Sequence, residues 1–237
     1  MISVLLPAFN EAENPFFWDT IKLIEDLKLN GVQIELLVGL TPGEDNTLDK
    51  LLDLGITTRV VHALNRGERY NQAFKDCNAG ENDWIVLNHP RSLLQKEAIL
   101  ELTLLHESIS WGAFTHQFNI HHPLLSFTSW WSNHVRGDLK KIFYLDHCLF
   151  IRRSLLEKVG GVPVVEIFED TILSHKLSEV SHPVRLRWKS TTSAIRFIKN
   201  GFWSQSLRNQ VLKLQFFLGT SDKKMNHSYE KDINLNR

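Results

Sequence analysis

The strongest constraint on the fold is a series of short apolar runs in the first half of the chain. They lie at residues 2–9, 34–40, 57–63 and 83–88, and the stretches between them have the apolar spacing of helices. A half-buried strand alternates between apolar and polar residues, whereas a strand buried on both faces is apolar throughout. The pattern therefore predicts an α/β fold with a mainly parallel central sheet and helices on both faces.

Three helices are expected between these strands, at residues 14–29, 47–55 and 66–77. Asn14 is a suitable N-cap for the first of them. Pro15 suits the first helical position, because that position needs no hydrogen-bonded N–H.

The second half is more mixed, but no linker or repeat divides it from the first. We expect a single α/β domain at residues 1–220, followed by a frayed polar tail at 221–237. The expected elements are helices at 97–109, 169–180 and 202–219, strands at 112–120 and 184–188, and a strand leading into a short helix at 143–161.

Composition excludes several classes of protein. Lys plus Arg and Asp plus Glu each number 27, so no global field favours nucleic acid. Cys77 and Cys148 lack metal-ligand spacing and indicate a reducing compartment. No apolar stretch approaches the roughly 20 residues that span a bilayer. The sequence therefore predicts a cytoplasmic protein with at most peripheral membrane contact.

Two further features have ordinary interpretations. His116, His121 and His122 have no converging spacing, which indicates exposed or hydrogen-bonded histidines rather than metal ligands. The helix 202–219 carries only two basic residues, too few for a membrane anchor. We therefore expect its apolar stripe to pack on the domain: Leu207, Val211, Leu214 and Leu218.

Polar segments follow three of the predicted strands, at residues 8–11, 41–46 and 88–91. In open α/β sheets, ligands bind beyond the carboxyl ends of the parallel strands. The three segments should therefore form the walls of a cleft.

Four ordered segments resemble glycosyltransferase family 2, over about residues 2–220. The family's opening strand and Asn-Glu pair resemble "ISVLLPAFNEAEN". Its Asp-containing strand, Gly-Gly turn and Glu-Asp pair resemble "YLDHCLFIRRSLLEKVGGVPVVEIFEDTILSHKL". An Arg-x-x-x-x-Asn helix start in "NRGERYNQAF" and a Thr-Thr-Ser-Ala-x-Arg segment in "TTSAIRFIKNGFWSQSLRNQ" are similar to one bacterial branch.

The resemblance implies the type A nucleotide-sugar fold, with residues 1–110 as the nucleotide-binding half and 111–220 as the acceptor half. It implies transfer of a sugar from a nucleotide diphosphate sugar to an unidentified acceptor hydroxyl, with inversion in most members. Such a reaction needs a general base and positive charge on the leaving diphosphate. In the family that charge usually comes from Mg²⁺ or Mn²⁺ held by an acidic motif after the fourth strand.

The same resemblance assigns roles to individual residues. Asp170 aligns with the family's base and is paired with Glu169, while Asp146 and Trp131 are acceptor-side candidates. Asp170 should then be partly exposed at the cleft and ionised near neutral pH; the alternative is that it only caps helix 169–180. The positions that match donor-binding segments are Ala8, Asn10, Glu11, Leu40, Arg66, Asn71, Asn88, His89 and Arg91.

Two positions depart from the family pattern. Leu40 stands where relatives carry an Asp, and residues 88–91, "NHPR", hold no carboxylate, so no metal ligand is assigned. Three explanations stay open. Arg91 and His89, helped by Arg66 and Arg69, replace the metal with fixed positive charge; or the protein is a catalytically degenerate member that binds a ligand or a partner; or Glu44 or Asp45 rebuilds a weak metal site.

Overall fold

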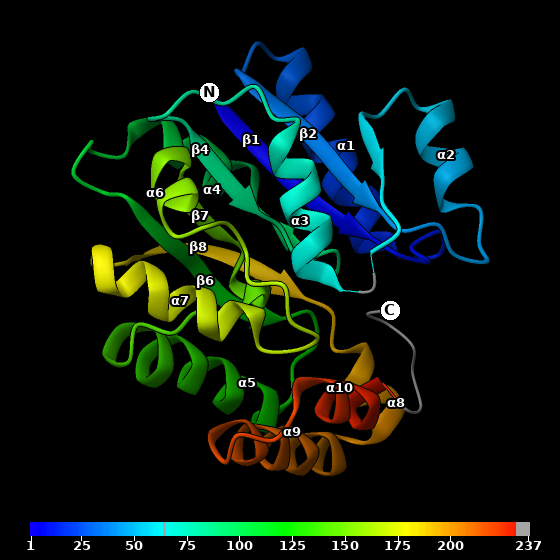
Figure 1. Ribbon diagram of the computed structural model, residues 1–237, viewed down its shortest axis with the longest axis vertical. Helices are drawn as coiled ribbons and strands as arrows, with labels where there is room; N and C mark the ends of the chain where they lie inside the picture. The colour runs from blue at the N-terminus through cyan, green and yellow to red at the C-terminus, as the bar shows by residue number, and fades with distance from the viewer. Residues whose placement is uncertain (64, 231–237) are drawn as a thin grey trace.

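The computed structural model describes residues 1–63 and 65–230. Its strands form one mixed eight-stranded sheet (Figure 1). The strands are β1 (Ile2–Ala8), β2 (Ile34–Leu40), β3 (Thr58–Val60), β4 (Trp84–Leu87), β5 (Ser92–Leu94), β6 (Trp111–Phe118), β7 (Leu149–Arg152) and β8 (Val184–Thr192).

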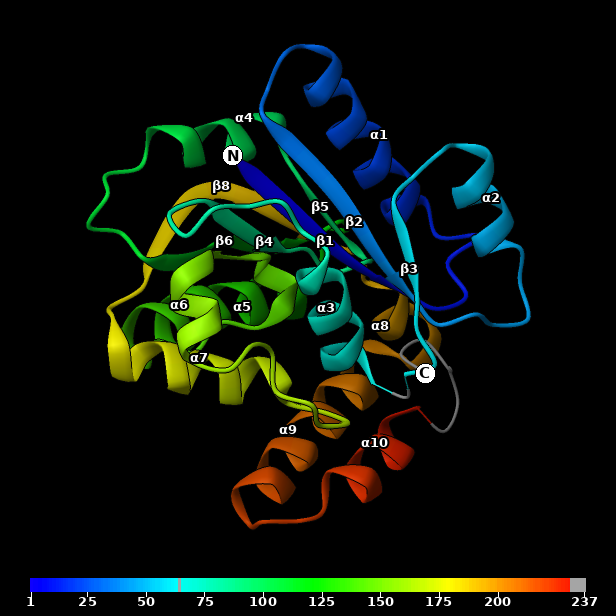
Figure 2. The ribbon, with the colours of Figure 1, turned by 45° about the horizontal axis from the view of Figure 1, so that its top comes forward.

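Helices lie on both sides of this sheet, which is easiest to see in Figure 2. The longer ones are α1 (Pro15–Leu29), α2 (Thr47–Asp53), α3 (Arg66–Lys75), α5 (Pro123–Trp130), α7 (Glu169–Val180), α9 (Phe202–Phe217) and α10 (Asp222–Glu230). The other helical elements are α4 (Lys96–Glu101), α6 (Arg153–Lys158), α8 (Ile195–Asn200), the 3₁₀ turns η1 (Leu102–Leu104) and η3 (Leu145–His147), and a π-helix, η2 (Trp131–Leu139), that continues α5.

The strand order is β3-β2-β1-β4-β7-β6-β8-β5. The four strands of the first half are parallel to one another, as predicted. In the second half, β7 is antiparallel to both β4 and β6, and β5 is antiparallel to β8. The α/β class, with parallel pairing in the first half and a mixed second half, is confirmed.

Neighbouring residues of β1 face two different cores. Val4 and Leu6 belong to a cluster that contains Ile24 of α1, whereas Leu5 belongs to a cluster that contains Tyr70 of α3. Successive strand residues point to opposite faces. The unbroken apolar character of β1 therefore reflects burial on both sides.

The sheet must curl, because β4 and β5 are joined by only the short turn 88–91. In a flat sheet, β7, β6 and β8 would hold β4 and β5 about 19 Å apart. A fully extended connection from Leu87 to Ser92 reaches about 18 Å, and this one is folded by a hydrogen bond from the Ser92 N–H to the His89 carbonyl. Curling brings the carboxyl end of β4 close to that of β8.

Several predicted elements differ from the structure. The helix expected at 97–109 ends as α4 and η1 by Leu104, and β8 extends to Thr192. The tail expected to be frayed begins with α10, and its residues 231–237 lie outside the described residues. The elements that were missed are β5, α5, η2 and α8.

Helix α9 faces the opposite way from the prediction. Leu207 and Leu214 are 67% and 59% exposed, while Gln205 is buried at 1%. Gln205 is held there by hydrogen bonds with Asn200 and Asn209. The prediction that the apolar stripe packs on the domain is wrong, because the opposite side of α9, with Gln205 and Leu212 buried, covers the cleft.

Asn71 ties α3 to the turn that leads toward α7. Its side-chain amide donates to the Val162 carbonyl (2.7 Å), and its side-chain oxygen accepts from the Val162 N–H (2.8 Å). Gly161 has a φ of +79°, and a Cβ there would lie 2.6 Å from Asn71 Oδ1. The turn therefore needs a glycine both for its left-handed conformation and for its close approach to Asn71.

We expect Asn71→Ala to lower the free energy of unfolding by about 2 kcal/mol, because the Val162 N–H and carbonyl lose their partners. Urea titration of the variant and of the wild-type chain measures this. Gln72→Ala, one residue along the same helix, is the matched control. Equal stability of the two variants would contradict a clamp at Asn71.

Candidate functional site

A cleft of about 460 Å³ opens beyond the carboxyl ends of β4 and β8. The starts of α3 and α7, the π-helix η2 and the inner side of α9 complete its walls. The sequence-predicted residues that line it are Arg66, His89, Arg91, Trp131, Asp146, Glu169 and Asp170. The structure therefore gathers catalytic, donor-side and acceptor-side candidates around one space.

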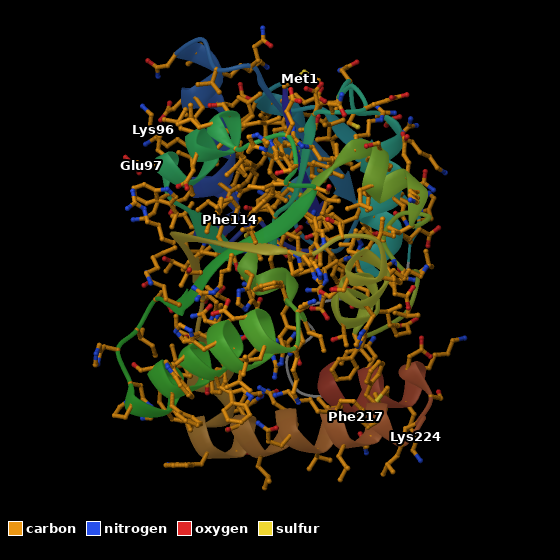
Figure 3. The ribbon with its side chains drawn as sticks, turned by 90° about the vertical axis from the view of Figure 1, so that its left-hand side faces the viewer. Met1, Lys96, Glu97, Phe114, Phe217 and Lys224 are labelled. Atoms are coloured by element: carbon orange, nitrogen blue, oxygen red, sulfur yellow. The ribbon has the colours of Figure 1, made fainter. Side chains whose placement is uncertain are left out.

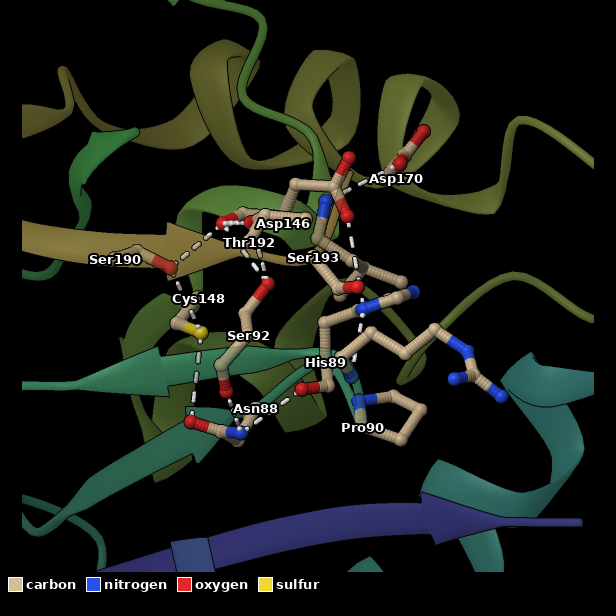
Figure 4. A network of polar contacts seen from close by, with 12 residues as sticks. Asn88, His89, Pro90, Ser92, Asp146, Cys148, Asp170, Ser190, Thr192 and Ser193 are labelled. Carbon is tan, nitrogen blue, oxygen red and sulfur yellow. Dashed lines mark hydrogen bonds and ion pairs between the residues drawn. The ribbon is translucent and has the colours of Figure 1, made fainter. Parts of the chain in front are cut away.

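The turn 88–91 is built by its own polar groups (Figure 4). The Asn88 side-chain amide donates to the carbonyls of His89 and Ser92. Pro90 is the second residue of the β-turn that runs from His89 to Ser92, where its fixed φ fits. The Pro90 carbonyl accepts from the Asn14 side chain (2.8 Å). With Asn88 only 1% exposed, these bonds hold the neighbouring His89 and Arg91 at the cleft wall.

Asp146 is positioned by hydroxyl groups from two strands. Its backbone carbonyl accepts from Ser92 of β5 (3.4 Å) and from Ser190 (2.6 Å) and Thr192 (3.2 Å) of β8 (Figure 4). The carboxylate lines the cleft, where burial raises its pKa. Curling of the sheet therefore brings the β5–β8 edge to the backbone that carries Asp146.

Arg66 and Glu169 form an ion pair between the first turns of α3 and α7. Arg66 Nη2 lies 2.6 Å and Nε 2.7 Å from Glu169 Oε1, and the two side chains are 17% and 3% exposed. Burial disfavours the charged guanidinium, but the negative charges of Glu169, Tyr70 and Asp170 and the hydrogen bond to Glu169 together raise the pKa of Arg66. Arg66 therefore remains a cation at any pH at which the protein is folded.

Asp170 lines the cleft but is only 8% exposed. Burial, and then the charge of Glu169, raise its pKa from 3.8 to about 7. The carboxylate accepts hydrogen bonds from the N–H groups of Leu145 (3.2 Å) and Thr171 (2.7 Å). The expectation of a partly exposed, fully ionised Asp170 is corrected, because desolvation outweighs the helix N-terminus.

The residue at the N-cap of α7 is Phe168, in a left-handed conformation with a φ of 66°. Asp170 follows inside the first turn of the helix. Its carboxylate accepts the N–H of Thr171, the next residue, and the N–H of Leu145, which belongs to η3. Asp170 is therefore not the N-cap of this helix.

His89 is a neutral residue. Burial, and then the charges of Arg66 and Arg91, hold its pKa well below the usual value. Its Nδ1 accepts the Arg91 N–H (3.2 Å), so the ring proton is on Nε2. The Asp146 carboxylate lies 3.6 Å from His89 Nδ1, but the neutral ring gives it no positive charge to pair with. The fixed positive charge at this wall therefore comes from Arg66 and Arg91.

Arg91 pairs with the acid that follows β1. Its Nη2 lies 3.3 Å from Glu11 Oε2, which also accepts from Asn14 (2.7 Å). Glu11 is 2% exposed, and burial raises its pKa to about 7, against the lowering effect of Arg91. Near neutral pH, Glu11 is therefore divided between its charged and uncharged forms.

The remaining predicted donor residues lie outside this cleft. Ala8 and Leu40 are fully buried in the sheet, and Asn71 serves as the clamp described above. Asn10 is exposed, has a φ of 52°, and accepts the Glu44 N–H (3.0 Å). Their predicted contacts with the donor stay predictions.

The loop after β2 is tied to the loop after β1. Asp45 accepts the Ala12 N–H (2.8 Å) and the Thr47 hydroxyl, and the hydroxyl of Thr47 accepts the Glu11 N–H (2.9 Å). Since Asp45 and Thr47 are occupied in this way, the loop is fixed against the Asn10-Glu11 segment. The predicted nucleoside-side residues are therefore held in place by their neighbours.

The residues that line the cleft without having been predicted include four basic ones: His116, Arg136, Arg196 and Lys213. Arg196 belongs to the quoted segment "TTSAIR", which was a usable signal. Arg136 lies in η2, whose helix was not predicted. Burial, and then Arg136, lower the pKa of Lys213 to about 8.

His116 is buried at 4%, and neither ring nitrogen has a hydrogen-bond partner among the described residues. Burial, and then His147, hold its pKa well below the usual value. The expectation of an exposed or hydrogen-bonded histidine is therefore wrong for His116, whereas His121 is exposed and His122 accepts the Leu124 N–H. A neutral imidazole at a cleft wall offers one donor and one acceptor, and leaving both unpaired is unfavourable.

The cleft does not present a set of ligands for a divalent metal. Across residues 1–63 and 65–230, no group of three or more His, Cys, Asp or Glu side chains could hold a metal ion. At the end of β4, His89 uses Nδ1 as an acceptor, and Arg66 and Arg91 lie nearby. Mg²⁺ and Mn²⁺ require several oxygen donors, so the residues present do not fit them.

The strand order, the curled mixed sheet and the cleft beyond β4 define the type A glycosyltransferase fold. No protein-family model and no curated protein matches the chain. Among solved structures, S. aureus TarS 1-349 in complex with UDP-GlcNAc superposes with a TM-score of 0.62 and 14% identity, covering 81% of this chain and 58% of that one.

Two further structures share the fold. A mannosyltransferase from Pyrobaculum calidifontis, in complex with GDP-Man and Mn²⁺, gives a TM-score of 0.59 at 16% identity, with 80% of this chain and 56% of that one covered. Glucosyl-3-phosphoglycerate synthase from Mycobacterium tuberculosis, with Mn²⁺, UDP and phosphoglyceric acid, gives 0.57 at 17%, with 80% and 69% covered. At these identities the likeness establishes the fold, and the chain spans less than two thirds of the TarS and mannosyltransferase structures.

We expect Asp170 to contribute a loss of stability as pH rises from about 4 to about 7, and Asp170→Asn to remove that contribution. Asp170 titrates at its ordinary 3.8 when unfolded and at about 7 when folded, so the folded state binds the proton more tightly in this window. The stability that this proton adds is fully present at pH values below the unfolded pKa, and it is lost once the pH reaches the folded pKa. The loss is on the order of a few kcal/mol.

Urea titration across this pH range measures the effect. Asp53→Asn, an exposed carboxylate at the end of α2, is the control. Glu11 acts in the same direction in this window and the buried His89 and His116 act in the opposite one, so the quantity compared is the difference in slope between variant and wild type. An Asp170→Asn variant with the full wild-type slope would mean that Asp170 is ionised in the folded state.

Proposed function

We propose that this chain is a glycosyltransferase that moves a sugar from a nucleotide diphosphate sugar to an acceptor hydroxyl, with inversion, and that Asp170 is the general base. The observation that carries this proposal is a cleft-lining carboxyl group whose pKa is about 7. A general base is most effective when its pKa lies near the working pH. The nucleotide-sugar complexes of TarS and the mannosyltransferase support this choice of donor.

In this proposal, Arg66 and Arg91 stabilise the leaving diphosphate in place of a metal. Both line the cleft, and each faces a carboxylate, Glu169 or Glu11, at 2.6 and 3.3 Å. Guanidinium groups bind phosphate oxygens in pairs, so a diphosphate can take over these contacts. Protonation of Glu11, whose pKa is about 7, would weaken the contact that Arg91 must give up.

His89 supports the same step as a neutral hydrogen-bond donor. With Nδ1 occupied by the Arg91 N–H, its Nε2–H is the group available to a phosphate oxygen. Asn88 acts by fixing the turn. Ala8, Asn10 and Leu40 would lie along the nucleoside, which places the donor over residues 1–110.

The acceptor would occupy the side of the cleft formed by residues 111–220. Asp146 and Trp131 line that side, together with His116. A hydroxyl-bearing acceptor would satisfy the two unpaired ring nitrogens of His116.

In the described part of the chain, no helix has both the length and the apolar composition needed to cross a membrane. We place the reaction in the cytoplasm.

A second function is favoured by one specific observation. Asp170 already accepts two N–H groups, and Arg66 is held by Glu169 at two nitrogens. A site whose charges satisfy one another in this way could belong to a family member that binds a ligand without transferring sugar. Measurement of the reaction itself decides between the two.

We expect the wild-type chain to hydrolyse or transfer from at least one donor in a panel of nucleotide sugars, and Asp170→Asn to reduce that rate by about 10²–10⁴. Asparagine retains the shape of aspartate but cannot take the acceptor proton. Donor affinity, measured by calorimetry, should change less than about twofold. Asp53→Asn is the control, and a bound donor that is never turned over would establish the binding-only function.

We expect Arg91→Ala to weaken binding of a nucleoside diphosphate by more than about tenfold, because charged hydrogen bonds contribute about 1.5–3 kcal/mol. Binding of the nucleoside should change little, since it carries no phosphate. The double variant Arg91→Ala/Glu11→Gln avoids leaving a buried charge unpaired and should show the same selectivity. Calorimetry with both ligands measures it.

Arg59→Ala, which removes a half-exposed arginine from the edge strand β3, is the control. A chelator should change the diphosphate affinity less than tenfold, or about 1.4 kcal/mol. Equal effects of Arg91→Ala on both ligands would mean that Arg91 serves only the fold.

A further inference from the structure

The outer face of α9 is an apolar surface at one end of the molecule. In Figures 1 and 2, α9 lies at the end opposite α1, and Figure 3 shows Phe217 and Lys224 at that end. Its side chains repeat every three or four residues along a helix about 24 Å long, and each is between 46% and 79% exposed. The outer face consists of Trp203, Leu207, Val211, Leu214, Phe217 and Leu218.

The opposite face of this helix is already occupied, mostly by polar side chains, with Leu212 buried among them at 4%. Gln205, Asn209 and Lys213 line the cleft, so α9 cannot turn its apolar side inward without exposing the cleft wall. An apolar face of this extent on a helix whose polar face is buried is the reverse of an ordinary surface helix. It implies that the outer face has a partner outside the domain.

The charges around the outer face identify the kind of partner. The chain as a whole has a net charge of +0, but segment 195–227 has a single acid, Asp222. Lys199 precedes α9, Lys223 and Lys224 follow it, and all three are exposed. The segment's other basic residues are Arg196, Arg208 and Lys213, of which Arg196 and Lys213 line the cleft, so the three lysines are the positive charges assigned to the outer face.

A second copy of the chain is a poor partner for such a surface. A two-fold dimer through α9 would bring the same basic ends together, and like charges would repel. A lipid surface that contains anionic headgroups neutralises the lysines and covers the apolar stripe at the same time. Tryptophan and phenylalanine near the ends of the stripe suit the boundary between headgroups and acyl chains.

We propose that the outer face of α9 binds the surface of an anionic lipid bilayer, with Lys199, Lys223 and Lys224 against the headgroups. The inner face of the same helix lines the cleft, so binding places the cleft beside the lipid surface. The proposal goes beyond sugar transfer. Its readout is vesicle binding, which does not depend on whether Asp170 is catalytic.

The full chain should bind vesicles of phosphatidylcholine containing about one third phosphatidylglycerol, and bind pure phosphatidylcholine vesicles at least about tenfold more weakly. Co-sedimentation across a range of lipid concentrations measures both affinities. High salt should weaken the first binding, because it screens the lysines. A wild-type chain that binds neither vesicle overturns the proposal.

Leu207→Ser/Leu214→Ser should weaken binding to the anionic vesicles by at least about tenfold, because two apolar side chains no longer enter the lipid. Both leucines are exposed, so the fold should be unaffected, and thermal melting checks this. The matched control is Leu29→Ser/Leu104→Ser, which changes leucines that are 85% and 83% exposed on other elements. Equal loss in both variants overturns the proposal.

Lys223→Ser/Lys224→Ser should lose about fivefold for each lysine, with Lys22→Ser/Lys96→Ser, exposed on α1 and α4, as the matched control. Equal binding by the two variants overturns the lipid assignment. Sedimentation velocity tests the rival partner. A dimer that the Leu207/Leu214 variant dissociates would show that a second copy covers α9, and would also overturn the proposal.

Discussion

The ion pair between Arg66 and Glu169 joins the two halves of the cleft. It connects the first turn of α3, which lies between the parallel strands β3 and β4 in the chain, to the first turn of α7 in the mixed half. Both partners are largely buried, so removing either leaves a charge without its counterion, which costs more than the pair itself contributes. The pair also sets the chemistry next to it, because Glu169 raises and Arg66 lowers the pKa of Asp170.

The same pairing recurs at the other wall, where Arg91 faces Glu11. Each cation of the proposed diphosphate site is thus paired with an acid when no ligand is bound. The arrangement keeps guanidinium groups ordered in a partly buried cleft, where unpaired charges would be strongly disfavoured. A metal ion needs the opposite arrangement, with acids converging and cations absent. The turn 88–91 is consistent with this, since its side chains provide a neutral imidazole and a guanidinium in place of carboxylates.

The sequence predicted those helices and strands whose pattern of apolar residues follows directly from which of their faces are buried. β1 is apolar throughout because both of its faces are buried, and α1 begins at Pro15 after Asn14. β5 was missed because its three residues form a strand only by pairing with β8. The α5–η2 segment was missed because a π-helix widens the turn and breaks the 3.6-residue period. The raised pKa of Asp170 depends on its burial against residues distant in sequence, such as Leu145, which no local pattern reveals.

Helix α9 shows a second feature that the sequence pattern could not predict, namely which side of the helix contacts the domain. The spacing of Leu207, Leu214 and Leu218 establishes that the helix has two faces, but not which face meets the domain. That choice is made by the cleft, whose polar wall is completed by Gln205, Asn209 and Lys213. An apolar face left in water is unfavourable unless something covers it. The lysines at both ends of α9, hidden in the neutral net charge of the chain, make an anionic lipid surface the partner that satisfies both requirements at once.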